Sequence, residues 1–399
     1  MEREGKNLDD IQSMNRALVV KYLSSHPGCS RAELSRISGL TQASITKIIR
    51  SLVEAGVVKE TGLTEGLRGR RSIGLKLNGK QFQVLGVKLS RTAVLVGVYD
   101  IRAKKYEERM EPLQYMDDID KAVKVILRNV AEFRSRYPKI MAIGIAVPGP
   151  FFKNEGRVRS IREQQGCNEV DIRTAFSGID IPVFIEHDVH AGAFACWWSD
   201  EDRSPSKTIV HFVASEGIGS GAVINGKVFN GSLGIAGEIG HVSIDYNGIP
   251  CECGNRGCLL KYCSSVAMEQ QVRNEISNHP ESCLSRLPEI SVSDIFAAMN
   301  QGDSYAVSVV EQMGTYMGYG LQVLVNMYNP DKVIISDIMT GGGEVMMRKI
   351  REVLRERLLL SIYEKLDIQY SDMQDDVILC GAALIAIDRI LSEPSQLLV

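Results

Sequence analysis

The stretch GHVSIDYNGIPCECGNRGC, Gly240 to Cys258, decides how we interpret this chain. It holds three of the nine cysteines and one of the six histidines. His241, Cys251, Cys253 and Cys258 follow the pattern H-x9-C-x-C-x4-C, and one imidazole with three thiolates is a complete tetrahedral ligand set for Zn²⁺. Because four protein ligands leave no open position for water, we predict a structural zinc ion and not a catalytic one.

The alternative for this cluster is a group of free cysteines in a flexible loop. Glycines at 248, 254 and 257 favour the metal site, because they let the backbone fold tightly enough to bring the ligands together. The total number of cysteines is odd and the others are scattered, which predicts reduced thiols and a cytoplasmic location. No segment approaches the ~20 apolar residues that span a bilayer, so we expect no membrane partner.

The charge of the chain is divided unevenly along its length. Residues 1–80 carry 14 Lys and Arg against 8 Asp and Glu, whereas residues 81–399 carry 32 against 41. The sequence therefore predicts a basic head on an acidic body, an asymmetry typical of proteins that bind nucleic acid through one part of the chain.

The basic head has the pattern of a helix-turn-helix unit. Apolar residues at helical spacing from Ile11 predict a first helix, which HPG at 26–28 ends. SRAE at Ser30–Glu33 predicts a capping box, and Gly39 ends this second helix. Thr41 is the predicted cap of a third helix. The residues of that helix that we expect to be buried are Ile45, Ile48, Ile49, Leu52 and Val53.

The polar side of the third helix and the segment after it predict contacts to double-stranded DNA. GVVKET and IGLKLN read as two strands of a wing, with an arginine-rich loop between them. A solvated three-helix unit is the alternative, but clustered arginines in a hairpin loop favour binding to phosphates or a minor groove. The predicted DNA-binding residues are Thr41, Gln42, Ser44, Thr46, Lys47, Arg50, Arg68, Arg70 and Arg71.

Beyond Asn78 the chain alternates strand and helix patterns, which predicts an α/β body. Asn225-Gly226 predicts a type I′ turn between two strands. Glycines at 217, 219 and 221 are compatible with a loop that holds a phosphate on backbone amides, and equally with a tight turn.

Four motifs together resemble the ROK family of repressors and sugar kinases. They are GIAVPGP, EHDVHAGAFA, SEGIGSGAVINGKVFNG and AGEIGHVSIDYNGIPCECGNRGCL, in the family's order. The resemblance implies a two-lobed actin-like ATPase body after the winged helix-turn-helix, a sugar in the cleft between the lobes, and a homodimer or homotetramer. We expect a head at 1–78, a first lobe at 79–190 with the C-terminal helix 380–399, and a second lobe with the zinc site at 191–379.

Two functions fit this resemblance: a repressor of carbohydrate-metabolism genes on a catalytically inactive kinase body, or an active sugar kinase with a DNA-binding head. Family kinases have an Asp-Leu-Gly-Gly-Thr loop around the ATP phosphates, where this chain has KLSRT with Lys88, Ser90 and Arg91. Glu216 lies in the second phosphate loop, and a carboxylate ~4 Å from a phosphate charge costs about 1–4 kcal/mol. We therefore predict a regulator and no enzyme, although Asp188 keeps the position of the family's catalytic base.

The resemblance also implies a ligand site. The matching positions are Pro148, Gly149, His187, Asp188, Glu238 and His241. At two matching positions this chain departs from the family, since His187 replaces Asn and Leu260 replaces Glu. Loss of a carboxylate that accepts from a hydroxyl removes ~1.5–3 kcal/mol, so we expect an ordinary hexose to bind weakly. A different sugar, a sugar phosphate or a protein partner stays open as the effector, and so does the alternative that Asp188 and Glu238 are only remnants.

Overall fold

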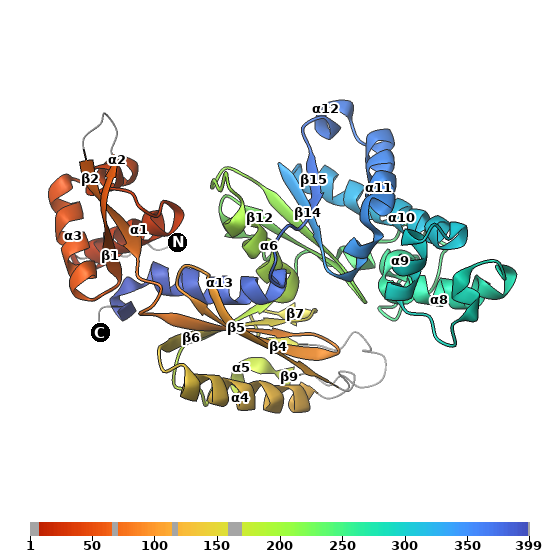
Figure 1. The fold of residues 1–399 in the computed structure, drawn as a ribbon, viewed down its shortest axis with the longest axis horizontal. Helices are drawn as coiled ribbons and strands as arrows, with labels where there is room; N and C mark the ends of the chain where they lie inside the picture. Colours follow the sequence, from red (N-terminus) through yellow and green to blue (C-terminus); the bar gives the residue numbers. More distant parts are fainter. Residues whose placement is uncertain (1–7, 66–70, 114–118, 159–169, 398–399) are drawn as a thin grey trace. The chain divides into compact units, whose positions relative to one another are not determined.

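The computed structural model describes residues 8–65, 71–113, 119–158 and 170–397, and the chain divides into two compact units (Figure 1). The first unit comprises Met1–Val147, Arg173–Glu186 and Leu379–Val399, and the second comprises Pro148–Ile172 and His187–Ile378. These units group the head with the first lobe and assign residues 148–172 to the second unit, unlike the three ranges predicted from the sequence. None of the described helices is both long and apolar enough to cross a membrane.

The head has the predicted order of elements. They are α1 (Leu8–Ser25), α2 (Arg31–Ser38), α3 (Gln42–Glu54), β1 (Val58–Glu65) and β2 (Arg71–Leu77). The capping box is confirmed, because the Ser30 hydroxyl accepts from the Glu33 amide while the Glu33 carboxylate accepts from the Ser30 amide. Gly39 ends α2 with a φ of 71°, in the left-handed conformation that favours glycine.

The buried stripe of α3 is narrower than the sequence predicted. Ile45, Ile49 and Leu52 are buried, but Ile48 is only half-buried and Val53 is 36 % exposed. The three buried positions are spaced by four and three residues and so lie along one line of the helix. Ile48 and Val53 lie at its edges, because a head this small covers α3 from one side only.

A five-stranded sheet forms the body of the first unit, in the order β10-β6-β3-β4-β5. The strands are β3 (Gln83–Leu89), β4 (Ala93–Asp100), β5 (Lys105–Pro112), β6 (Ile140–Val147) and β10 (Val183–His187). Helices α4 (Ile119–Arg136) and α13 (Val377–Ser392) lie on opposite faces (Figure 1). α13 approaches so closely that a Cβ on Gly144 would lie 1.8 Å from the Ala382 carbonyl oxygen. Glycine is therefore required at this crossing.

The far end of α13 contacts the head within the same unit. Lys21 Nζ of α1 lies 3.0 Å from Asp388 Oδ1, and the short helix η6 (Pro394–Leu397) packs beside α1 with Leu397 buried. Helix α13 thus contacts both the first sheet and the head.

The sheet of the second unit has the order β13-β12-β11-β14-β15. Its strands are β11 (Ile209–Ala214), β12 (Ile218–Ile224), β13 (Lys227–Val228), β14 (Lys332–Ser336) and β15 (Asp367–Tyr370). In the first sheet β3, β4 and β5 are antiparallel neighbours and β3 also pairs in parallel with β6. In the second sheet β11, β12 and β13 are antiparallel neighbours and β11 also pairs in parallel with β14. The same strand order twice in one chain indicates a duplicated α/β lobe. A small sheet accompanies the second unit and contains β7 (Phe151–Phe152), β8 (Arg157–Val158) and β9 (Val170–Asp171).

The helices of the second unit pack around one large apolar core. Helix α6 (Asp188–Ser199) lies on β11 and β12. After β13, the described helices of four or more residues in this unit are α7 (Leu260–Cys263), α8 (Ser265–Glu275), α9 (Val292–Asn300), α10 (Ser304–Tyr328), α11 (Gly343–Arg357) and α12 (Leu360–Tyr363). Two 3-10 turns lie among them, η4 (Cys283–Arg286) and η5 (Ile338–Gly342). A shorter 3-10 turn, η2 (Ile239–His241), leads into the cysteine-rich loop.

Candidate functional site

The loop from His241 to Cys258, which we call the zinc loop, is folded back on itself by its own backbone. Isolated bridges pair Ser243 with Cys258 and Pro250 with Arg256. The Cys251 amide donates to the Asn255 carbonyl at 2.8 Å, which closes a turn around Cys253. These bridges bring residues from both ends of the loop to one place.

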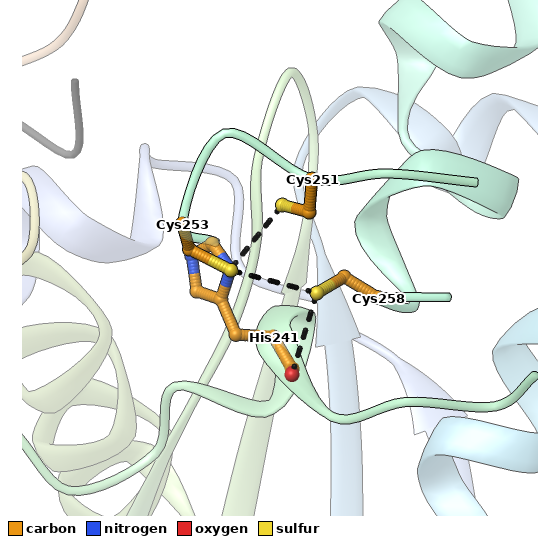
Figure 2. A group of neighbouring side chains, drawn as sticks. All are labelled: His241, Cys251, Cys253 and Cys258. Atoms are coloured by element: carbon orange, nitrogen blue, oxygen red, sulfur yellow. Dashed lines mark hydrogen bonds between the residues drawn. The ribbon is translucent and has the colours of Figure 1, made fainter. Parts of the chain in front are cut away.

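Four potential ligands converge in the zinc loop (Figure 2). The ligand atoms of His241, Cys251, Cys253 and Cys258 all lie within 4.8 Å of one another. Cys253 Sγ is 3.6 Å from Cys258 Sγ, and Cys251 Sγ is 3.8 Å from His241 Nδ1. Ligands about 2.0–2.3 Å from a tetrahedral Zn²⁺ are separated by ~3.5–3.8 Å. The spacing therefore fits the predicted zinc set, and the donor chemistry of three sulfurs and one imidazole suits that ion.

Burial affects the ionisation of the cysteines in the zinc loop. Burial, followed by hydrogen bonds from neighbouring cysteines, raises the pKa of Cys258 to about 12. Burial also raises the pKa of Cys251. A metal ion deprotonates a thiol that coordinates it, so a bound dication would overcome the tendency of burial to keep these thiols neutral.

Two interactions outside the ligand set support the zinc loop, and neither could be predicted from the sequence. The Asn255 side-chain amide donates to the His241 carbonyl at 3.1 Å. The Ile249 amide donates to the Tyr262 hydroxyl at 3.0 Å. Tyr262 belongs to α7, so the loop is fixed to the helical part of the unit. A side chain that accepts from a backbone amide 13 residues away leaves no periodic pattern by which it could be found.

A second cluster of predicted site residues lies in the same unit, around the start of α6. His187 Nε2 is 3.3 Å from Asp188 Oδ1 and 3.9 Å from Glu238 Oε1. A Cβ on Gly149 would lie 2.4 Å from His187 Nε2 and 2.8 Å from Glu238 Oε1. The turn at Gly149 therefore approaches the imidazole and the carboxylate directly, and a side chain at this position would displace both.

The electrostatics of this acidic cluster, formed by Gly149, His187, Asp188 and Glu238, are unusual. Burial, with the neighbouring Asp188 carboxylate, raises the pKa of Glu238 to about 7, and His190 opposes the shift. His187 is buried between the two carboxylates. The arrangement can donate to and accept from hydroxyl groups, which is the chemistry of polyol recognition.

Other residues near this cluster, and the remaining positions named from the sequence, make different contacts. His190 is fully buried and its Nε2 donates to the Ala236 carbonyl at 2.8 Å, so it ties α6 to the segment before Glu238. Glu238 precedes the turn that carries His241, whose amide donates to the Glu238 carbonyl at 3.1 Å. Leu260 opens α7 and packs against the apolar core, so it offers no polar contact. Pro148 directly precedes Gly149, and no specific contact distinguishes it.

The predicted DNA-binding residues of α3 gather on one exposed side of the helix. Gln42, Thr46 and Arg50 are exposed and four residues apart, and Lys47 is exposed beside them. Thr41 and Ser44 have a different role, since the Thr41 hydroxyl accepts from the Ser44 amide at 3.2 Å and caps the helix. Arg68 and Arg70 lie outside the described residues, and Arg71 opens β2 with a side chain that is likewise not described.

The candidate phosphate loops have structural explanations of their own. The turn from β3 to β4 is closed by Ser90, whose amide and hydroxyl both donate to the Ala93 carbonyl. Gly219 and Gly221 lie within β12, where a Cβ would be 2.7 Å and 2.2 Å from atoms of Val189 in α6. These two glycines allow close packing between the strand and the helix, which accounts for them without a phosphate. Glu216 precedes them, and its buried Oε2 has no hydrogen-bond partner within the described part of the chain.

A DNA-binding head joined to a duplicated α/β body with a cysteine-rich loop defines a class of two-part regulatory proteins. The model of the ROK family matches residues 84–389, and a winged helix-turn-helix DNA-binding model matches residues 18–59. The chain belongs to the ROK family.

The chain matches transcriptional regulators over nearly their whole length. The chain is 28 % identical to the DNA-binding transcriptional dual regulator NagC of Escherichia coli, with 92 % of this chain and 91 % of NagC covered. It is 26 % identical to the xylose repressor of Caldicellulosiruptor bescii, with 96 % and 98 % covered. The crystal structure of a ROK family transcriptional regulator, a homologue of the E. coli MLC protein, matches with a TM-score of 0.83 at 29 % identity and covers 97 % of this chain and 99 % of its own.

The kinases of the family share the body fold. A ROK family glucokinase from Streptomyces griseus matches with a TM-score of 0.65 at 22 % identity, and it covers 76 % of this chain and 99 % of its own. The match leaves about a quarter of this chain uncovered. The chain is a DNA-binding transcriptional regulator in which a winged head is joined to the actin-like body of the ROK family.

Proposed function

We propose that this chain represses carbohydrate-metabolism genes and that an effector bound at the second unit controls its affinity for an operator. The observation that carries the proposal is the exposed polar side of α3 in a winged head, joined to a body whose full-length relatives include the transcriptional dual regulator NagC and a xylose repressor. NagC and the xylose repressor supply the class of regulated genes only by similarity.

The head contacts DNA in two ways under this proposal. Gln42 and Thr46 face base edges in a major groove, while Lys47 and Arg50 neutralise phosphates beside it. The arginines of the wing, Arg68, Arg70 and Arg71, add contacts to the backbone or the minor groove. Since one winged head reads one half-site, a two-fold operator requires two copies of the chain.

Zinc has a structural role in this proposal. His241, Cys251, Cys253 and Cys258 would bind Zn²⁺ through all four positions, which leaves none for a substrate. When bound, the ion supplies positive charge and a fixed tetrahedral geometry. The zinc loop begins three residues after Glu238, and so it holds the chain segment that contributes Glu238 to the acidic cluster.

The effector binds at the acidic cluster in this proposal. Asp188 and Glu238 accept from ligand hydroxyls, and His187 donates to or accepts from the same ligand. This site departs from the family pattern at His187, which replaces Asn, and at Leu260, which replaces Glu. The effector is therefore a sugar, a sugar phosphate or a protein partner that binds without the polar contacts of the replaced residues. The body transfers no phosphate, because Ser90 closes the first loop and Glu216 places a carboxylate in the second.

Operator titration with and without candidate effectors tests this function. Fluorescence anisotropy with DNA from upstream of neighbouring carbohydrate genes should show sequence-specific binding that one sugar or sugar phosphate changes. Lys47→Ala should weaken binding, and Lys124→Ala, the same change on the exposed side of α4, should not. Equal binding to unrelated DNA, or equal loss in both variants, would contradict the proposal.

A thermal-shift screen identifies the effector class independently of DNA. A ligand that binds only the folded state raises the melting temperature by mass action. Asp188→Asn should abolish the shift, while Asp202→Asn, a change at an 88 % exposed side chain, should leave it intact. Sugar-dependent release of ADP from ATP would instead support the kinase alternative.

A further inference from the structure

A hollow lies on the head beside the predicted DNA-binding side of α3. Its lining residues are Arg31, Thr46, Arg50, Val53 and Glu54. Its volume is about 440 Å³, enough for a phosphate group together with several waters of ~30 Å³ each. All the lining residues except Arg31 belong to α3, whereas Arg31 is the first residue of α2. Arg31 is not among the residues that the sequence predicted to contact DNA, so the hollow adds a cation to that surface.

The position of the hollow along α3 favours the DNA backbone over base edges. Recognition helices read bases mainly through their N-terminal residues, but the hollow follows the second half of α3, from Thr46 to Glu54. The Thr46 hydroxyl donates to the Gln42 carbonyl at 2.8 Å. The guanidinium groups of Arg31 and Arg50 are therefore the donors that remain. A guanidinium group binds phosphate through two parallel hydrogen bonds, so two of them in one hollow indicate a phosphate site.

Arg31 is paired with a carboxylate of the head itself, since its Nη2 lies 2.8 Å from Oε1 of Glu60 on β1. The two side chains are 34 % and 43 % exposed, and exposed ion pairs of this kind stabilise a folded protein only weakly. A carboxylate accepts from a guanidinium group in the same geometry as a phosphate, so Glu60 occupies the place that a phosphate oxygen would take. The two anions repel each other at contact distance, which favours exchange over simultaneous binding. The lining of the hollow carries two arginines against Glu54, and Glu60 cancels the excess positive charge.

We propose that Arg31 and Arg50 bind one phosphate of the DNA backbone in this hollow, and that Arg31 exchanges Glu60 for that phosphate. Glu60 then competes with DNA for Arg31 and lowers the affinity of the head for every sequence, because phosphate contacts carry no base information. The competition limits the retention of the head on DNA outside its operator. The inference requires DNA binding by the head, but neither repression nor an effector.

Titration of non-operator duplex DNA with the full chain, followed by fluorescence anisotropy at several salt concentrations, tests the exchange. Glu60→Gln should bind about 2- to 5-fold more tightly per head, the effect of removing a weak, exposed competitor. Arg31→Ala should bind less tightly and lower the salt slope by about one per head. Glu60→Gln added to Arg31→Ala should gain clearly less than it gains in the wild type, because no Arg31 remains to be freed.

Glu108→Gln is the matched control, because it removes the same charge from an exposed ion pair outside the head. Glu108 Oε2 lies 2.6 Å from Lys105 Nζ on β5, and the two side chains are 31 % and 26 % exposed. The DNA affinity of this variant should equal that of the wild type. Far-ultraviolet circular dichroism and the melting temperature check that each variant folds.

Three results would overturn the inference. Unchanged or weaker DNA binding by Glu60→Gln would show that the pair only tethers α2 to β1. An equal gain in Glu108→Gln, or in the protein that lacks Arg31, would show general repulsion in place of competition. An unchanged salt slope in Arg31→Ala would remove the phosphate from the hollow. Failure of the proposed function has a different signature, since a wild-type chain without operator preference or effector response rejects repression, while the measurements on non-operator DNA still decide the exchange.

Discussion

Replacing Gly257 with alanine would obstruct the zinc loop at a point where the backbone has no space. Gly257 has a φ of +68°, and a Cβ there would lie 1.7 Å from the Asp245 carbonyl oxygen. Gly254 provides a matched control in the same loop, because its φ is +89° and a Cβ there would meet nothing within 4 Å. Both alanines would adopt the left-handed conformation, at a cost of ~1–2 kcal/mol each, but only Ala at 257 must also push the opposing strand from 1.7 Å to at least 3.0 Å.

The difference between the two variants should appear in zinc affinity. Cys258 follows Gly257 directly, and metal ligands tolerate displacements of only about 0.2 Å. Gly254→Ala should weaken zinc binding roughly 5–30-fold, since 1.4 kcal/mol is tenfold. Gly257→Ala adds overpacking of ~1–3 kcal/mol, which predicts a loss of roughly 30-fold or more. Competition with a chromophoric chelator measures both affinities, and equal values for the two variants would refute this account of the zinc loop.

Three further predictions concern DNA, chemistry and the contact between head and body. Gln42→Ala should relax base preference, whereas Arg70→Ala should weaken binding to all sequences and reduce the salt slope by about one; uniform weakening by Gln42→Ala in anisotropy titrations would contradict these roles. The purified chain should release no ADP from ATP with common hexoses, pentoses or amino sugars, and ADP production that Asp188→Asn abolishes would overturn the regulator interpretation. A double-mutant cycle on Lys21→Ala and Asp388→Ala should give a coupling below ~1 kcal/mol in urea unfolding that salt reduces further, because the pair is partly exposed; a coupling above ~2 kcal/mol would show a stronger link.

Local patterns in the sequence predicted the head well. The caps of α2 and α3 depend on residues at most a turn or two apart, namely Ser30 with Glu33, Gly39 and Thr41. The spacing of residues in the sequence predicts such local interactions. The turn at Asn225-Gly226 follows the same logic, since the type I′ turn needs positive φ at both residues and the structure has 53° and 70°.

Contacts between distant segments could not be predicted from the sequence. The spacing of Gly219 and Gly221 suits a phosphate loop, but these residues are glycines because α6 packs against them. Val53 fits the apolar periodicity of α3, but the small head does not extend far enough to cover it. The four candidate zinc ligands could be predicted because they are close in sequence, whereas Tyr262, which supports the loop, could not.

The position of α13 has a consequence for the order in which the chain folds during synthesis. The strands that surround Gly144 leave the ribosome early, but the helix that packs onto them at Ala382 is made only after the whole second unit. The second unit can close while translation continues, whereas the first must wait with the α13 face of its sheet uncovered until α13 is made. A premature stop codon before Leu379 would therefore leave an intact second unit beside an apolar, aggregation-prone sheet, so a C-terminal truncation would damage the part of the protein made first.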